Sequence, residues 1–359
     1  MTKFTRQELY DLVWSEPMRT LAAKYSISDR GLAKACAAAN IPVPARGYWN
    51  KLEAGHKVEK QPLPHRRVGQ SNTVVIGGNR WSGDYISDEA LLEIPVPPEP
   101  IFEVSIDEIR QRVAASVAKA PLPKKMTKPH RLIAKILDGD EIRRQKYLAS
   151  PYRSSWDAPI FDSAFEKRRL KILNALFICL EHCGVRASIR GKEARDITIT
   201  VGDHHLSPTL DSTKATKLLE RERSGYSFTA RGSDDPMRFR LPDWRIPEKD
   251  QTTWEDQETL KLEDQLASVA TELIVAGEMA YRKGEIRHRE WIIERKAALI
   301  EKERQRLIEE DRKRREREAK LERQRIEHLL GQANALHQAM QIRTMSMQYG
   351  RQMPRQQSR

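Results

Sequence analysis

The feature that most constrains the fold is the spacing of small and apolar residues between positions 18 and 37. Five of them stand where two short helices joined by a tight turn must touch, namely Leu21, Ala22, Ile27, Leu32 and Ala35. Ala22 matters because a larger side chain at a close helix crossing would push the helices apart. Ile27 fills the turn. The stretch therefore predicts two short helices that cross closely.

The second of these helices has its own start signal. Ser28 can accept a hydrogen bond from a free backbone N–H of the first turn and so act as the N-cap. The turn before it departs from the usual pattern, because Ser26 stands where a left-handed backbone favours glycine. Gly31 lies inside the helix, where it costs about 1 kcal/mol relative to alanine.

A further helix precedes the pair. Thr5 and Glu8 form a capping box at its start. Ser15 is expected to cap the next helix, with Pro17 in the first turn, where a missing N–H does no harm. The sequence thus predicts three short helices within the first forty or so residues, the usual size of a trihelical unit.

Residues 18–37 resemble the helix-turn-helix of bacterial repressors, activators and recombinases. The resemblance implies that the second helix lies in the major groove of double-stranded DNA, with Arg30 on guanine and Asp29 on a cytosine amino group. Lys34 is expected to meet phosphate. The full set of predicted DNA-binding residues is Ser28, Asp29, Arg30, Ala33, Lys34, Arg46 and Lys51. The alternative is a small helical bundle that contacts no nucleic acid.

Residues 41–51 cannot continue the helix, because two prolines interrupt them. Tyr48 and Trp49 are expected to fold back onto the core. Arg46 and Lys51 would then lie beside the groove as phosphate contacts. The first 57 residues are similar to a module found ahead of basic, helix-rich tails in bacterial proteins of uncharacterised function. The residues that carry this similarity are Pro42, Pro44, Gly47, Tyr48 and Trp49.

The charge balance favours a polyanionic partner. Of the 359 residues, 32% are charged and 39% hydrophobic, and the net charge is +13. Such a surplus of cations is typical of proteins that bind nucleic acid. An anionic membrane surface is the alternative, but no amphipathic anchor or lipidation motif supports it. We therefore expect double-stranded DNA as the partner, and no membrane.

The cysteine count and the N-terminus favour the cytoplasm. Cys36, Cys179 and Cys183 do not suggest a disulfide framework. The first residues form neither an apolar signal nor a transit peptide, and no apolar run is long enough to span a membrane. The expected location is the cytoplasm, in association with the nucleoid.

Hydrophobic periodicity predicts an α+β fold that is mostly α. Its expected parts are an N-terminal trihelical helix-turn-helix, a middle antiparallel sheet packed on a buried helix, and a long charged C-terminal helix. The expected domains are a DNA-binding domain over 1–57, a Pro/Gly-rich linker over 58–104, a basic helical segment over 105–161, a small α+β domain over 162–248, a long charged helix or coiled coil over 252–342, and a disordered basic tail over 343–359.

The pattern also predicts individual elements within these domains. Helices are expected at 106–119, 130–137, 140–149 and 214–222, and a buried one from Ser163 to Gly184. Strands are expected at 73–76, 185–190, 195–201, 204–210, 226–231 and 237–241, with Gly202-Asp203 as a two-residue hairpin turn.

The C-terminal helix carries part of a coiled-coil seam. Ile293, Ile300, Leu307 and Leu321 keep a sevenfold spacing, which Arg314 interrupts. Charge pairs four residues apart can hold such a helix in water without a partner. A homodimer through this helix is therefore predicted beside the alternative of a lone spacer.

One triplet suggests enzymatic chemistry. Asp203-His204-His205 resembles the signature of the DHH phosphoesterases, which use such residues to bind catalytic metal ions. That family also expects an earlier strand ending in Asp-x-Asp-Gly, whereas the nearest segment here is Asp138-Gly139-Asp140. We therefore expect a non-catalytic protein. A metal-dependent nuclease or phosphodiesterase centred on the triplet is one alternative, and a structural or interaction protein is the other.

Two cysteines and a basic region complete the candidates. Cys179 and Cys183 stand one helical turn apart and could bind zinc with His204 or His205, but an apolar helix favours core packing. No cofactor motif is present, so no cofactor is expected. Residues 124–171 interleave cations with aromatic residues. This pattern fits a surface that binds unpaired bases or phosphates, and it fits equally well a solvated helix face with its aromatic residues turned inward. The aromatic members are Tyr147, Tyr152, Trp156 and Phe161.

Overall fold

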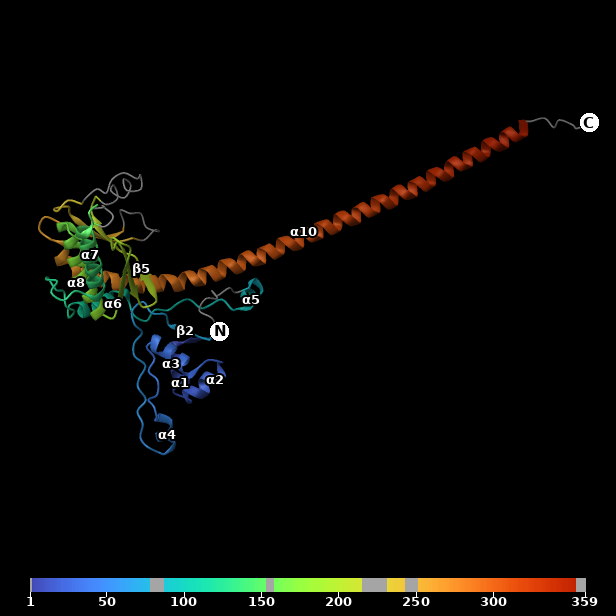
Figure 1. Cartoon of the computed structure of the whole chain (residues 1–359). Coiled ribbons are helices and arrows are strands. Elements are labelled where there is room, and N and C mark those ends of the chain that lie inside the picture. The colour runs from blue at the N-terminus through green and yellow to red at the C-terminus, as the bar shows by residue number, and fades with distance from the viewer. Residues whose placement is uncertain (1, 78–86, 153–157, 215–230, 243–250, 353–359) are drawn as a thin grey trace, which may run out of the picture. The chain divides into compact units, whose positions relative to one another are not determined.

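The computed structural model describes residues 2–77, 87–152, 158–214, 231–242 and 251–352. The chain divides into two compact units, Met1–Tyr85 with Pro98–His288 and Ile86–Pro97 with Arg289–Arg359. Most described residues are helical, and the strands form small antiparallel sheets (Figure 1). The predicted α+β class, mostly α, is therefore confirmed.

The first unit begins with a trihelical head, which we define as residues 2–77. Its elements are β1 (Thr2–Thr5), α1 (Arg6–Val13), α2 (Met18–Lys24), α3 (Asp29–Ala38), α4 (Tyr48–Glu53) and β2 (Thr73–Ile76). Leu9, Leu21 and Leu32 are fully buried where α1, α2 and α3 meet. Ala22 is buried at the crossing of α2 and α3, as its small size predicts.

Local signals account for the helix starts in the head. The capping box of Thr5 and Glu8 is present, and the Ser28 hydroxyl accepts from the Gly31 N–H at 3.0 Å. Ser26 adopts the left-handed conformation with φ of 53°, despite its side chain. The predicted cap at Ser15 is wrong: Pro17 is the N-cap of α2, and the Ser15 hydroxyl donates to the Leu12 carbonyl instead.

The strand predicted at 73–76 is confirmed as β2, which pairs antiparallel with β1. Exposed and buried residues alternate along β2, and the buried ones, Val74 and Ile76, belong to the head core. The segment expected as linker therefore includes a strand of the head sheet.

The rest of the first unit is a body, which we define as residues 98–288. Its helices are α6 (Ile106–Val117), α7 (Arg131–Ala149) and α8 (Ala164–His182). α8 begins at the Ser163 cap, and Gly184 follows it with φ of 76°, as predicted. The second half of α8 is buried on nearly all sides and forms the centre of the core. α7 is one helix rather than the predicted two, because Gly139 is accommodated inside it.

The body strands form two three-stranded antiparallel sheets instead of the single predicted sheet. One sheet has the order β3 (Arg186–Arg190), β4 (Asp196–Val201) and β5 (His204–Leu206), and the other has β6 (Thr209–Ser212), β7 (Met237–Leu241) and β8 (Thr252–Glu255). The predicted strand 204–210 breaks between β5 and β6, where Pro208 lacks a ladder N–H. The predicted helix 214–222 and strand 226–231 fall almost wholly outside the described residues.

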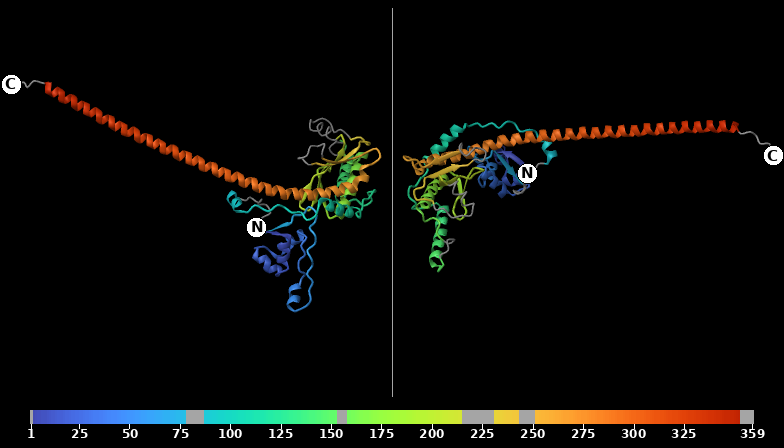
Figure 2. Two further views of the ribbon diagram at one scale, coloured as in Figure 1. Left: turned by 180° about the vertical axis from the view of Figure 1, so that it is seen from behind. Right: turned by 90° about the horizontal axis from the view of Figure 1, so that it is seen from above.

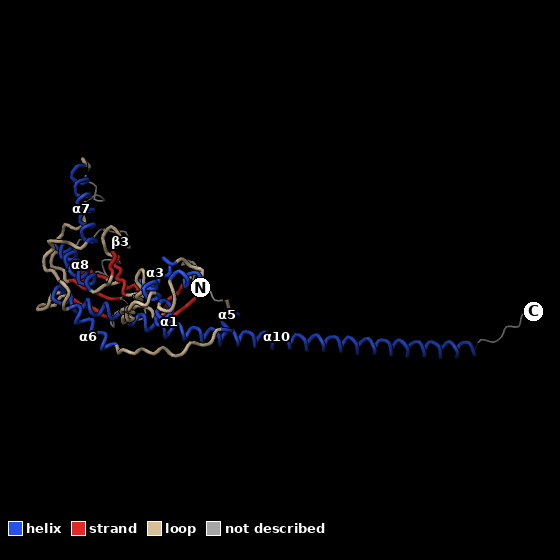
Figure 3. The backbone as a smooth tube through the Cα atoms, turned by 90° about the horizontal axis from the view of Figure 1, so that it is seen from below, coloured by secondary structure: helices blue, strands red, loops and turns tan. Residues whose placement is uncertain are grey.

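The C-terminal helix starts later than predicted. The expected helical start near 252 is wrong, because Thr252–Glu255 forms β8, whose Trp254 packs on Phe239 of β7. The 3-10 turn η3 (Leu262–Gln265) then leads into α10 (Leu266–Gln352). Within the body, Val269, Ala270 and Leu273 of α10 are fully buried in the core. Figures 2 and 3 show the first part of α10 running through the body.

The second unit joins α10 beyond residue 288 to α5 (Asp88–Glu93). Leu91 of α5 and Ile292 of α10 are buried, and Arg295 pairs with Asp88 at 2.9 Å. α10 continues to Gln352, so residues 343–352, expected as disordered, are helical. Residues 353–359 of the predicted tail lie outside the described residues.

Candidate nucleic-acid interface

α3 has one buried and one exposed face. Leu32, Cys36 and the following Ala39 point into the head core. Arg30 and Lys34 lie one turn apart on the opposite side, where both are exposed. Neither has an ion-pair partner among the residues that the structure describes. The two side chains are therefore available to an external anion.

Small residues surround these two cations. Ala33 is half-buried, and Ala37, Ala38 and Gly31 are exposed on the same side of α3. Side chains of this size do not hold a neighbouring surface away from the helix backbone. Another molecule can approach α3 closely, with only Arg30 and Lys34 projecting toward it.

Ser28 and Asp29, the other two predicted contacts near the start of α3, already accept hydrogen bonds from backbone N–H groups of that helix. Ser28 uses its hydroxyl to cap the helix, and an Asp29 carboxylate oxygen accepts from the Arg30 N–H at 2.7 Å. Both remain exposed. Ser28 therefore positions the helix, whereas Asp29 keeps one carboxylate oxygen outside this local hydrogen bond.

Arg46 and Lys51 are carried on a separate segment. Arg46 lies in the loop before α4, and Lys51 is in the last turn of α4; both are exposed. Tyr48 packs edge-to-face on Trp14 with ring centroids 5.1 Å apart, so α4 is attached to the head core through this ring. The expected return of Tyr48 to the core is thus confirmed.

The C-terminal end of α3 is held by three side chains that no sequence motif indicated. Arg6 donates to the Ala39 and Asn40 carbonyls at 2.8 and 3.1 Å. Gln70 donates to the Ala38 carbonyl at 2.5 Å, and Arg67 donates to the Asn40 side chain. Burial and the neighbouring Arg66 and Arg67 lower the pKa of Arg6. Cations and an amide N–H thus satisfy the partial negative charge of this helix end.

The segment 65–71, which we call the joint, attaches the head to the body. Glu278 of α10 is fully buried, and its carboxylate accepts from Arg66 at 2.5 Å, from the Gly69 N–H at 2.9 Å and from Arg282 at 3.0 Å. Burial by itself raises the pKa of Glu278, but these hydrogen bonds outweigh it and hold the pKa below its usual value. Gly69 of the joint lies directly against Gly202, the residue after β4. A Cβ on Gly202 would lie 2.2 Å from the Gly69 carbonyl carbon.

The second basic region is divided between the body core and the surface. Arg169 is fully buried and bonds to Glu166 at 2.7 Å, and Arg168 is held by Asp256 and Glu263. Arg143 pairs with Asp140, and Phe161 is buried. These residues serve the body core. The exposed members of the region are Lys124, Lys125, Lys128, Arg131, Lys135, Lys146, Tyr152, Lys167 and Lys171, and Trp156 lies outside the described residues.

Gly202 and Asp203 form the predicted turn, with Gly202 at φ of 59°, and His204 and His205 are the first residues of β5. Each side chain has a separate partner: Asp203 accepts from the Ser71 N–H at 2.8 Å, His205 contacts Thr200 at 3.0 Å, and the His204 ring lies 6.2 Å from that of Tyr281. The described residues contain no group of three potential ligands placed to hold a metal ion. Asp203 thus helps to fix the joint.

The cysteines lie in apolar surroundings. Burial raises the pKa of Cys179 to about 12, with a smaller contribution from Cys183, and raises that of Cys36 to about 11. Zinc binds the thiolate form, which is strongly disfavoured at these positions. The two buried thiols act as small apolar groups in the cores.

No known protein family, curated protein or solved structure has a significant match to this chain. Within the part of the chain that the structure describes, no helix has the length and apolar character needed to cross a membrane.

Proposed function

We propose that this protein binds double-stranded DNA without chemical catalysis, and that α3 reads the major groove. The observation that carries the proposal is the exposed face of α3, where Arg30 and Lys34 project from a surface of small residues. A groove reader needs a helix whose backbone can approach the base edges closely, with a few long donors. The net charge of +13 supports binding to a polyanion.

The division of labour between the predicted contacts follows from their positions. Arg30, near the start of α3, donates a pair of hydrogen bonds to guanine, and Asp29 accepts from cytosine. Lys34, Arg46 and Lys51 contact phosphates and fix the register. The protein would then act in the cytoplasm on the nucleoid, as a regulator or as a factor of a phage or other mobile element.

The test is a comparison of Arg30→Ala and Lys51→Ala on two duplexes. One duplex is selected by the protein from a random pool, and the other has a scrambled sequence. Arg30→Ala should weaken binding to the selected duplex about tenfold or more, and weaken binding to the scrambled one much less. Lys51→Ala should weaken both alike and reduce the salt dependence by about one ion.

Arg190→Ala is the matched control, because Arg190 is an exposed arginine at the C-terminal end of β3, outside α3. It removes the same charge and should leave the sequence preference unchanged. Equal losses on both duplexes for Arg30→Ala would contradict base reading by α3. Failure of the wild-type protein to bind any duplex at low salt would favour a structural or interaction protein instead.

We further propose that two copies associate through α10. From Arg312 to Met347 every side chain is exposed, so the apolar residues of this stretch have no cover within their own unit. Residues 326–347 keep a heptad stripe that only Arg343 interrupts within this range, and a second copy offers an identical stripe to cover it. The members of the stripe are Ile326, Leu329, Ala333, Leu336, Met340 and Met347. Two heads would then read two half-sites.

Light scattering after size-exclusion chromatography tests this association. The wild-type protein should have the mass of a dimer, and Leu329→Glu with Leu336→Glu should halve it. Ile342→Glu is the control, because Ile342 is also exposed but lies on the opposite side of the helix. A monomeric wild-type protein, or an equal effect of Ile342→Glu, would overturn the proposed seam.

A further inference from the structure

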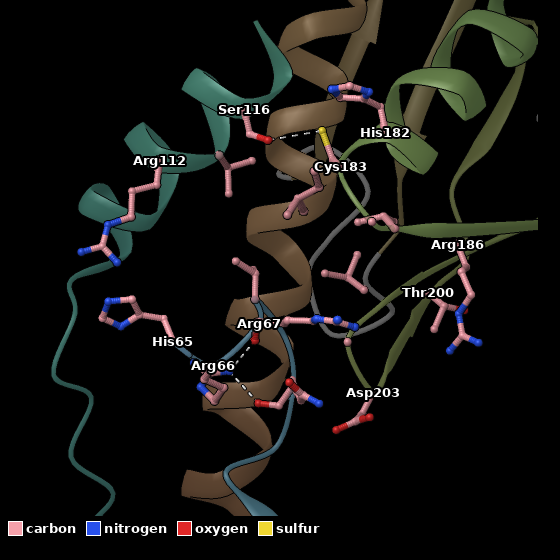
Figure 4. A pocket seen from close by; sticks show the side chains of 18 of the residues that line it. His65, Arg66, Arg67, Arg112, Ser116, His182, Cys183, Arg186, Thr200 and Asp203 are labelled. Carbon is pink, nitrogen blue, oxygen red and sulfur yellow. Dashed lines mark hydrogen bonds between the residues drawn. The ribbon is translucent and has the colours of Figure 1, made fainter. Parts of the chain in front are cut away.

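A cleft with a volume of about 950 Å³ lies in the first unit, where the end of α3 and the joint meet the body. Its walls come from α3, the joint, α6, the end of α8 and the strands β3 and β4 (Figure 4). The volume falls in the range of about 300–1,000 Å³ that small-molecule sites usually have. The cleft is therefore large enough for a ligand of nucleotide size.

The floor of the cleft is apolar. Val113 of α6, Val201 of β4 and Ile274 of α10 line it, together with Val185 after α8. These four side chains are between 1% and 6% exposed, so they belong to the packed core and form a fixed surface. A flat ring or another apolar body can cover them with little rearrangement.

The polar lining of the cleft is mostly cationic. Arg67 of the joint, Arg112 of α6 and Arg186 of β3 line it beside a single carboxylate, Asp203. Figure 4 shows Arg67, Arg186, Thr200 and Asp203 gathered in one part of the cleft, with Arg112 and His65 across from them. One Asp203 oxygen already accepts from the Ser71 N–H.

The arginines differ in what holds them. Arg66, also in the lining, is committed to the buried Glu278, and Arg112 pairs with Glu108. Arg67 donates only to the amide oxygen of Asn40, and Arg186 has no ion-pair partner within the described residues. Arg67 and Arg186 therefore keep donors for an anion, and arginine favours phosphate because its planar fork matches two phosphate oxygens.

One buried acceptor in the lining has no partner. Gln70 is 6% exposed, and its amide nitrogen bonds to the Ala38 carbonyl, but its side-chain oxygen has no hydrogen-bond partner among the described residues. Buried polar atoms are nearly always hydrogen-bonded, so an unpaired one indicates a missing partner. A ligand with an N–H or O–H group on its apolar body supplies that partner.

We propose that this cleft binds a small organic phosphate of nucleotide size. The ring of this ligand lies on the apolar floor, and its N–H or O–H group donates to the side-chain oxygen of Gln70. Its phosphate accepts hydrogen bonds from Arg67 and Arg186. The cleft adjoins the exposed face of α3, because Ala37 and Ala38 belong to both, but Arg67 and Arg186, which take the phosphate, lie outside α3. It does not depend on DNA binding, and it is tested without DNA.

Calorimetric titration with each of the four ribonucleoside 5′-monophosphates tests the proposal. At least one should bind saturably, and more tightly than either its nucleoside or inorganic phosphate alone. Arg186→Ala should weaken that binding about tenfold, as expected for the loss of a charge-assisted hydrogen bond. Arg190→Ala, at the other end of β3, is the matched control and should bind like wild type.

Three outcomes would overturn the proposal. The first is that none of the four nucleotides binds. The second is that Arg186→Ala has no effect, or that Arg190→Ala has the same effect. The third is that Arg186→Ala weakens the binding of duplex DNA but not of any nucleotide. The cleft would then be a site for the DNA backbone. A thermal unfolding curve of each variant confirms that it is folded.

Discussion

Two stretches of the same helix, α10, are stabilised in opposite ways. Between residues 266 and 288 the helix belongs to the body core, and Val269, Ala270, Leu273 and Val275 are fully buried. From Arg312 to Met347 every side chain is exposed. Between Glu301 and Glu316, charge pairs three and four residues apart take the place of burial. A continuous helix therefore does not imply a continuous source of stability.

The charged residues of the two regions differ in the same way. In the body, Arg168 is held by Asp256 at 2.6 Å and by Glu263 at 2.6 Å, and the Asp256 side chain is 4% exposed. On the outer part of α10, Arg312 and Glu309 pair at 2.8 Å with both side chains open to water. The distances are similar, but the exposure of the pairs to water differs. That exposure decides how much each pair contributes to the free energy of unfolding.

The largest expected effect comes from breaking the buried cluster. Arg168→Met should lower the free energy of unfolding by about 3–5 kcal/mol, because it leaves the Asp256 carboxylate buried without its cation. Urea unfolding followed by hydrogen exchange of the α8 amides, which lie in the body core, measures the loss. Arg312→Met is the control and should leave this transition where it is. Equal effects of the two variants would remove the contrast drawn above.

Acid should break the same cluster in the unaltered protein. Burial by itself raises the pKa of Asp256, but the hydrogen bonds from Arg168 and two backbone N–H groups hold it at about 2 instead of 3.8. A carboxyl whose pKa is lower in the folded state stabilises fully above its unfolded value and loses that contribution as the pH falls through the folded one. Body stability should therefore fall between pH 3.8 and about 2.

The slope of this acid transition sharpens the comparison. Arg168→Met removes the cation that lowers the Asp256 pKa, so unfolding measured across the same pH range should depend less on pH in that variant. An unchanged slope would assign the acid sensitivity to other groups. Glu278 acts in the same direction in both proteins, because its pKa is also below the usual value.

A smaller effect distinguishes the two stretches through their glycines. A Cβ on Gly277 would lie 2.4 Å from the Val201 Cβ, whereas nothing lies within 4 Å of a Cβ on Gly331. Gly277→Ala should therefore destabilise the body by about 1–3 kcal/mol through overpacking. Gly331→Ala should stabilise its stretch of helix by about 1 kcal/mol.

Hydrogen exchange of the α8 amides and thermal unfolding by circular dichroism, applied to both glycine variants, separate these outcomes. The first signal reports the body, and the second reports all helices. Stabilisation of the body by Gly277→Ala would mean that β4 is not packed as closely on α10 as the structure has it.

Local signals predicted the elements that depend on near neighbours. The caps at Thr5, Ser28 and Ser163 were each predicted from a few adjacent residues, and each is present. The buried second half of α8 followed from its continuous apolar run. The exposed positions of Arg30 and Lys34 followed from the helical period, because Leu32 and Ala35 were expected to face the neighbouring helix.

Contacts between distant segments were beyond such reasoning. Nothing near Glu278 distinguishes it from the many exposed acids of a charged helix, yet it is fully buried because the joint, some two hundred residues earlier, brings Arg66 and the Gly69 N–H to it. Arg169 belongs to a run of cations that looks solvated, but the Glu166 carboxylate and two backbone carbonyls surround it.

The amino-acid sequence by itself determined the helix starts, the trihelical head, the mostly helical α+β class and the surplus of positive charge, because each depends on composition or on residues a turn or two apart. Only the tertiary structure decided which charges are buried, how the strands divide between two sheets and where the cleft beside α3 lies. The physical reason is that desolvation and pairing depend on what the folded chain brings alongside a residue.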